Sequence, residues 1–305
     1  MDLTRRDFLL TSAAAAVATS LPDDSPEALV KAFHKGLTAA QRKEVVLPWE
    51  HKHRLHVVNN WNVTKPKIGQ FFTADQRQLL RDIVKGLASD EGQDKFPRVM
   101  KGDNKGFENY TTAVFGNPDG DKWVWFLTGR HLTMKCDGDT QEGAVFGGPI
   151  FYGHSGDAKD NFNEGPTHPG NVFWHQATLA NELFGALDGK QREKALLKDS
   201  PEEDVATLKL GGPAQGIAAA ELSKDQKGLL EGVLRSILAP YRAKDVEEAM
   251  KAVGGVDTLH LSFYSDEDLG NDKVWDNWMI RGPKIAWFFR GNPHVHTWVN
   301  VGTTL

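Results

Sequence analysis

Residues 110–136 read YTTAVFGNPDGDKWVWFLTGRHLTMKC, and this stretch decides the fold class. Residues 110–115, 123–128 and 131–136 are rich in β-branched and aromatic side chains, which is typical of strands. The sequence FGNPDG at 115–120 predicts a tight hairpin connection, because Gly, Asn, Pro and Asp favour turns. Three strands follow one another here with no helix between them, which indicates antiparallel pairing.

The rest of the chain extends this pattern in both directions. Strands cluster instead of alternating strictly with helices, which predicts an α+β fold: a mainly antiparallel sheet flanked by helices, in a single large domain. Apolar residues spaced three and four apart predict the helices. The further strands are expected at residues 145–152, 258–264, 278–280, 285–289 and 295–301, and the helices at 76–87, 172–187, 191–197, 226–238 and 245–253.

One short pattern occurs four times: a Thr, Ser or Asp is followed three residues later by Gln. Such a pair predicts a capping box, in which the first side chain and the Gln each bond the other residue's backbone amide at a helix start. Four helix starts explain the pattern more simply than an internal repeat does. The four capping residues are Thr38, Thr73, Asp188 and Ser223.

The N-terminus predicts export. In MDLTRRDFLLTSAAAAVATSL, Arg5 and Arg6 precede an apolar run at 8–17, and small residues follow where a signal peptidase would cut. The run is too short for a stable membrane anchor. We therefore interpret residues 1–21 as a twin-arginine signal peptide that engages the twin-arginine translocase, and residues 22–305 as one domain that works in the periplasm or as a secreted protein.

Composition and missing motifs exclude several classes of function. The net charge is −5 and the pI is near 6.1, so no broad basic surface favours nucleic acid. Cys136 is the only cysteine, so an intramolecular disulfide is excluded. The sequence has no Walker loop, dinucleotide-binding fingerprint, Gly-x-Ser-x-Gly elbow or HExxH helix.

The histidines offer the sharpest candidate site. His294 and His296 flank one residue, and on a strand such a pair projects from the same face. Two neutral imidazoles so placed are half of a Zn, Cu or Fe site. The same spacing also occurs on solvated sheet faces that bind nothing.

Other residues can complete a site. His131 starts a strand, His154 lies in a Gly-rich loop and His175 starts a helix. Arg130 either clamps an anionic substrate through paired hydrogen bonds or pairs with a carboxylate. Glu182, in a helix, either supports the metal, acts as a base or is merely solvated.

Four other histidines are expected to have no role in a site. His260 alternates with leucines on a strand, which favours a hydrogen-bonded structural position. His51, His53 and His56 lie in a charged, poorly patterned stretch and are expected to be solvated.

The chain resembles the family catalogued as domain of unknown function 3500. The resemblance is carried by the strand segments of 110–133, by GPIFYG at 148–153, by RGP at 281–283 and by HVHTW at 294–298. It covers the chain from about Arg77 to the C-terminus. The resemblance implies that His131, His294 and His296 are the best site residues.

Two departures from that family's pattern affect the site. The family usually has a double histidine where this chain has Arg130 and His131, and acidic residues are common in relatives near His175. Three hypotheses remain: an exported enzyme that uses a divalent metal (Zn, Cu or Fe) on a small-molecule substrate, a non-catalytic protein that binds a metal or small ligand, and a structural domain whose histidines only satisfy hydrogen bonds.

Overall fold

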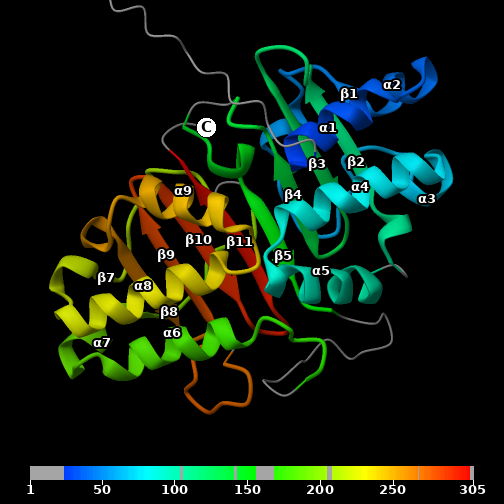
Figure 1. The fold of residues 1–305 in the computed structure, drawn as a ribbon. Helices are drawn as coiled ribbons and strands as arrows, with labels where there is room; N and C mark the ends of the chain where they lie inside the picture. Colours follow the sequence, from blue (N-terminus) through cyan, green and yellow to red (C-terminus); the bar gives the residue numbers. More distant parts are fainter. Residues whose placement is uncertain are drawn as a thin grey trace, which may run out of the picture.

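A computed structural model describes residues 24–103, 106–140, 143–155, 168–204, 208–266 and 268–302. The predicted signal peptide at 1–21 lies outside these residues. Within them, one sheet runs through the molecule and helices cover one of its faces (Figure 1). The predicted α+β class with a mainly antiparallel sheet is confirmed.

The sheet contains eleven described strands, in the order β1-β2-β3-β4-β5-β11-β10-β9-β8-β6, with the short β7 paired to β8. Only the two edge pairs, β1 with β2 and β6 with β8, are parallel. The strands are β1 (Val46–Leu47), β2 (Thr111–Gly116), β3 (Trp123–Thr128), β4 (Leu132–Cys136), β5 (Ile150–Gly153), β6 (Leu196–Leu197), β7 (Ile217–Ala218), β8 (His260–Tyr264), β9 (Asn277–Gly282), β10 (Ile285–Arg290) and β11 (His296–Val301).

The strands predicted from 110–136 form the expected antiparallel β2-β3-β4 meander. The prediction of one strand over 145–152 was too long. Residues Val145–Gly147 form a 3-10 turn, because Phe146 and the two glycines after it all have positive φ, and β5 begins only at Ile150. Backbone with positive φ cannot continue a strand.

Helices form wherever the sequence predicted one, with ends shifted by a few residues. The helix predicted at 191–197 ends at Ala195, since Leu196 and Leu197 form edge strand β6. The helices are α1 (Pro26–Lys35), α2 (Ala39–Val45), α3 (Ile68–Phe71), α4 (Ala74–Leu87), α5 (Asp90–Gly102), α6 (His175–Ala186), α7 (Gly189–Ala195), α8 (Lys224–Leu238) and α9 (Ala243–Val253). All four predicted capping boxes are present.

The structure also shows the internal repeat that the capping interpretation had set aside. The sheet order is the same from either edge: β1 to β5 in the first half match β6 and β8 to β11 in the second. Each half begins with two helices and a short edge strand, followed later by a pair of longer helices (α4 and α5, or α8 and α9) and four strands; the first half adds the short α3 and the second adds the short β7. Gln41 and Gln76 exchange hydrogen bonds between their side-chain amides, and Gln191 and Gln226 do the same; each pair is 35 residues apart. The caps are therefore repeated because the supersecondary unit is repeated.

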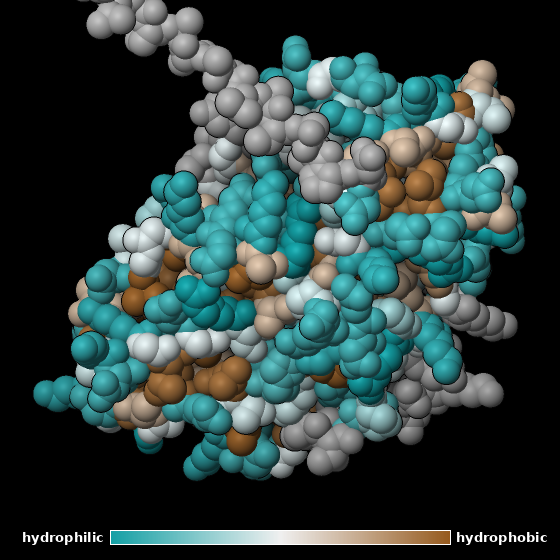
Figure 2. Space-filling view, viewed as in Figure 1, coloured by the Kyte–Doolittle hydropathy of each residue, from teal (hydrophilic) through white to brown (hydrophobic). Residues whose placement is uncertain are grey.

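Both faces of the sheet are covered, but unequally. In Figure 1 α1, α4 and α5 lie over the strands of the first half, and α6, α8 and α9 lie over those of the second. The main core lies under these helices and includes Trp125 and Trp287. Smaller clusters on the opposite face are closed by irregular chain, through Trp61 in one half and Leu208 in the other. Hydrophilic residues cover most of the helical face, with small separate hydrophobic patches (Figure 2).

Candidate metal centre

The two halves meet where β5 pairs with β11, and the candidate histidines lie at one end of this seam. His296 starts β11 opposite Gly153, the last residue of β5. His131 precedes β4, whose Leu132 pairs with Tyr152. The turn before β4, the end of β5 and the start of β11 therefore place side chains from distant parts of the chain at one point.

His131, His294 and His296 form a buried group, which we call the histidine trio. Their side chains are 2–6% exposed, and one ring nitrogen from each lies within 4.8 Å of the others. The Nε2 atoms of His294 and His296 are 3.1 Å apart. Two nitrogens bound to one tetrahedral Zn²⁺ lie about 3.3 Å apart, from Zn–N distances of 2.0–2.1 Å. The pair already has ligand spacing, whereas the limit of 4.8 Å that holds for the whole trio is about 1.5 Å longer than the spacing of two Zn-bound nitrogens.

A buried carboxylate orients His131. Asp103, fully buried at the end of α5, accepts hydrogen bonds from Nδ1 and from the backbone N–H of His131, each at 2.6 Å. Tyr110 donates its hydroxyl to the same carboxylate at 2.7 Å. Burial, followed by the charge of Asp103, raises the pKa of Tyr110, so it remains a donor. With Nδ1–H committed to Asp103, Nε2 of His131 presents its lone pair, as in carboxylate–histidine–metal arrangements.

A second carboxylate supports His296. Glu203, in the irregular chain after β6, approaches Nδ1 of His296 at 3.4 Å and forms an ion pair with Arg290 at the end of β10. Burial, with nearby Arg290 and the other imidazoles, holds the pKa of His296 well below its usual value. His296 is therefore neutral at physiological pH, the form that binds metals.

His154 contacts the histidine trio without joining it. Its ring stacks on His294 with centroids 3.8 Å apart and meets His131 edge-on at 4.3 Å. Burial lowers the pKa of His154 to about 3, so its imidazole is neutral as well. Its ring nitrogens are not among the three ligand atoms that converge, and its observed contact with His294 is packing.

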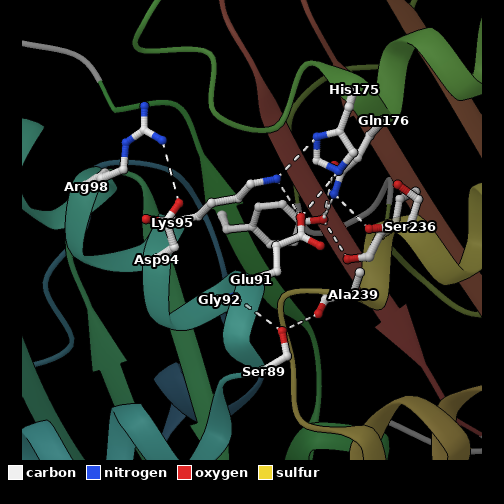
Figure 3. Close-up of polar contacts among 12 residues, drawn as sticks. Ser89, Glu91, Gly92, Asp94, Lys95, Arg98, His175, Gln176, Ser236 and Ala239 are labelled. Atoms are coloured by element: carbon white, nitrogen blue, oxygen red, sulfur yellow. Dashed lines mark hydrogen bonds and ion pairs between the residues drawn. The ribbon is translucent and has the colours of Figure 1, made fainter.

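The structure places His175 and Glu182 apart from the histidine trio. His175, at the start of α6, pairs with Glu91 at 3.3 Å and contacts Lys95, both on α5 (Figure 3). Its side chain is 41% exposed. Glu182 lies on the exposed side of α6. Arg130 immediately precedes His131, and its charge contributes to the low pKa of His154.

His51, His53 and His56 are not solvated as expected. All three are half-buried, and the rings of His53 and His56 pack edge-on against Trp61 with centroids 5.8 and 4.9 Å away. The cause is the irregular chain of the first half, which folds back over the sheet and closes the cluster around Trp61.

Sequence reasoning missed both carboxylates that support the trio. Asp103 follows a helix in a short polar loop, and Glu203 is one of three successive acidic residues. Neither has a motif, and solvated charge is the ordinary interpretation of both segments. Their roles follow only from tertiary contacts.

No curated protein and no solved structure matches the sequence significantly. The profile described as TAT (twin-arginine translocation) pathway signal sequence matches residues 2–22, so the protein is exported across the membrane. Across the described residues, no helix has both the length and the hydrophobicity needed to span a bilayer. The profile described as Protein of unknown function (DUF3500) matches residues 22–299, which confirms the resemblance, and the chain therefore belongs to the DUF3500 family.

Proposed function

We propose that the protein is an exported metalloenzyme, acting in the periplasm or outside the cell, whose ion is bound by His131, His294 and His296. The observation that carries the proposal is the buried histidine trio, in which two of three imidazoles are each supported by a carboxylate. The Nε2 atoms of His294 and His296 lie 3.1 Å apart, and one ring nitrogen of each of the three imidazoles lies within 4.8 Å of the others, a convergence that favours an ion between them.

Three histidine ligands leave at least one coordination position for water or substrate. A Zn²⁺ ion would supply hydroxide for hydrolysis, whereas Cu or Fe would support oxidation. Burial lowers the pKa of His296 and keeps this ligand neutral, Asp103 fixes the His131 tautomer, and the burial of all three rings excludes bulk water. We assign Arg130, beside His131, to stabilising negative charge on the reacting group. Glu182 has no role in this proposal, because it is exposed on α6.

Elemental analysis of the exported protein, purified without an affinity tag, tests metal binding. We expect one ion per chain, and its loss in His131→Ala and His296→Ala. His175→Ala is the matched control, since it removes an imidazole that lies in a surface ion pair. Metal-free wild-type protein that stays metal-free after incubation with Zn²⁺, Cu²⁺ and Fe²⁺ would refute the proposal.

Substrate screening of metal-loaded protein separates an enzyme from a metal-binding protein. Turnover that His296→Ala abolishes and His175→Ala retains supports the enzyme. One tightly bound ion with no turnover of any hydrolytic or oxidative substrate would instead assign the protein to metal binding alone.

A further inference from the structure

A polar pocket of about 430 Å³ lies directly beside the histidine trio. Its volume is within the range of small-molecule sites, roughly 300–1,000 Å³. Glu203 and Arg290 belong both to this pocket and to the support of His296. The wall of the pocket therefore contacts the imidazole of His296 through Glu203.

The walls of the pocket offer mainly hydrogen-bond acceptors. Glu202, Glu203 and Asp266 contribute carboxylates, which accept hydrogen bonds and cannot donate when ionised. Two of the nearby donor residues are directed at these carboxylates: Ser200 donates its backbone N–H and its hydroxyl to Asp266, both at 2.7 Å, and the Arg290 guanidinium pairs with Glu203. The side-chain amide of Asn277 donates instead to the Ser200 hydroxyl at 3.2 Å. A complementary ligand must therefore bring donors of its own.

The net negative charge of the pocket disfavours anions. Its described walls hold three carboxylates and one guanidinium, and an anionic ligand would meet net repulsion at short range. The amide of Asn277 and the hydroxyl of Ser200 add neutral polar groups to the same wall. Hydroxyl and ammonium groups are the donors that suit such a surface.

We propose that this pocket binds the substrate of the metal centre, and that the substrate is a hydroxyl-rich compound, uncharged or carrying an amino group, such as a sugar or an amino sugar. The inference rests on the proposed function, because it assigns the pocket to the substrate side of the histidine trio. It goes further by naming a substrate class that the trio alone does not specify.

Calorimetric titration with two matched series tests the substrate class: glucosamine, glucose and glucuronate, and galactosamine, galactose and galacturonate. With metal-loaded wild-type protein at neutral pH, we expect binding in the order amine, neutral sugar, acid. Glu202→Gln removes one exposed pocket carboxylate and should weaken amine binding about two- to fivefold, with the neutral sugar less affected. Asp199→Asn, the same charge change one residue outside the pocket, should leave both unchanged.

Each outcome bears on one proposal separately. Tightest binding of the acid, or no binding of any member up to about 10 mM, would overturn the pocket inference even where one ion per chain is found. The same titration on metal-free protein completes the test. Amine-selective binding to protein that cannot take up metal would support the pocket while refuting the metal centre.

Discussion

Replacing Asp103 with Asn is the sharpest test of how the site is built. The carboxylate accepts three hydrogen bonds, from Nδ1 and the backbone N–H of His131 and from the hydroxyl of Tyr110. An Asn side chain keeps the shape but offers one acceptor oxygen and a donating NH2 group. One of the three donors then faces another donor, and His131 loses the group that fixes its tautomer.

The expected magnitude follows from this geometry. Loss of a carboxylate that orients a metal-bound histidine lowers metal affinity about 10- to 100-fold. Glu203→Gln should cost less, under about tenfold, because Glu203 lies 3.4 Å from His296 and is 22% exposed. Asp103→Asn should also destabilise the metal-free fold by about 2–3 kcal/mol, since a buried donor is left unsatisfied.

Chelator-competition titration measures the affinity, and urea denaturation of metal-free protein measures the stability separately. Tyr110→Phe serves as the control, because it removes one donor to Asp103 but keeps the carboxylate on His131; its metal affinity should change less than about threefold. If Asp103→Asn folds and binds metal as tightly as wild type while His131→Ala does not bind, Asp103 has no orienting role and the reasoning fails.

Three further outcomes are expected from the structure. Burial raises the pKa of Asp276 to about 7, so the folded state loses stability as the pH rises from about 4 through 7. In urea denaturation, Asp276→Asn should therefore be about 1–2 kcal/mol more stable than wild type at pH 8 and similar to wild type at pH 4. A hydrogen bond from His175, together with Lys95, lowers the pKa of Glu91 to about 2. Glu91→Gln should lower the free energy of unfolding by under about 1 kcal/mol at pH 7. In an acid titration, this difference from wild type should fade as the pH falls from about 4.5 towards 2. Gln76 belongs to the buried pair of hydrogen-bonded caps, and Gln76→Ala should lower the free energy of unfolding by about 2–3 kcal/mol. Gln226 belongs to the half-buried pair, and Gln226→Ala should lower it by about 1 kcal/mol. Equal losses in the two variants would contradict the role of burial.

Local patterns predicted the strands and caps well because their causes are local. The β-branched and aromatic residues of 123–128 and the turn at 115–120 define a hairpin without tertiary help, and Thr73 with Gln76 defines a cap. Strand periodicity also pointed to the histidine pair at 294 and 296, although in the structure only His296 lies in β11 and His294 precedes it. By contrast, His131 has no sequence periodicity that links it to β11; its place at a strand start made it one of several candidates, and the family resemblance then favoured it over the others.

The unpredicted parts of the site depend on contacts across the sheet seam. Asp103 acts on His131 only because α5 ends where β4 begins, and Glu203 reaches His296 only because the chain after β6 crosses the other face. The internal repeat was set aside for a similar reason. In the sequence, the repeat is visible only as four short capping patterns. The repeated strand order that explains them appears only when all strands are paired in the sheet.

The repeat places the proposed ion between two half-molecules. The first half supplies His131 with its carboxylate Asp103, and the second supplies His294 and His296 with Glu203. An ion bound by both halves binds the folded state and not the separated halves. The free energy of unfolding must therefore rise with the concentration of free metal, by about 2.7 kcal/mol when that concentration is one hundred times the dissociation constant. Each half alone holds an incomplete ligand set. The proposed metal site therefore lies at the seam between β5 and β11 and needs residues from both halves.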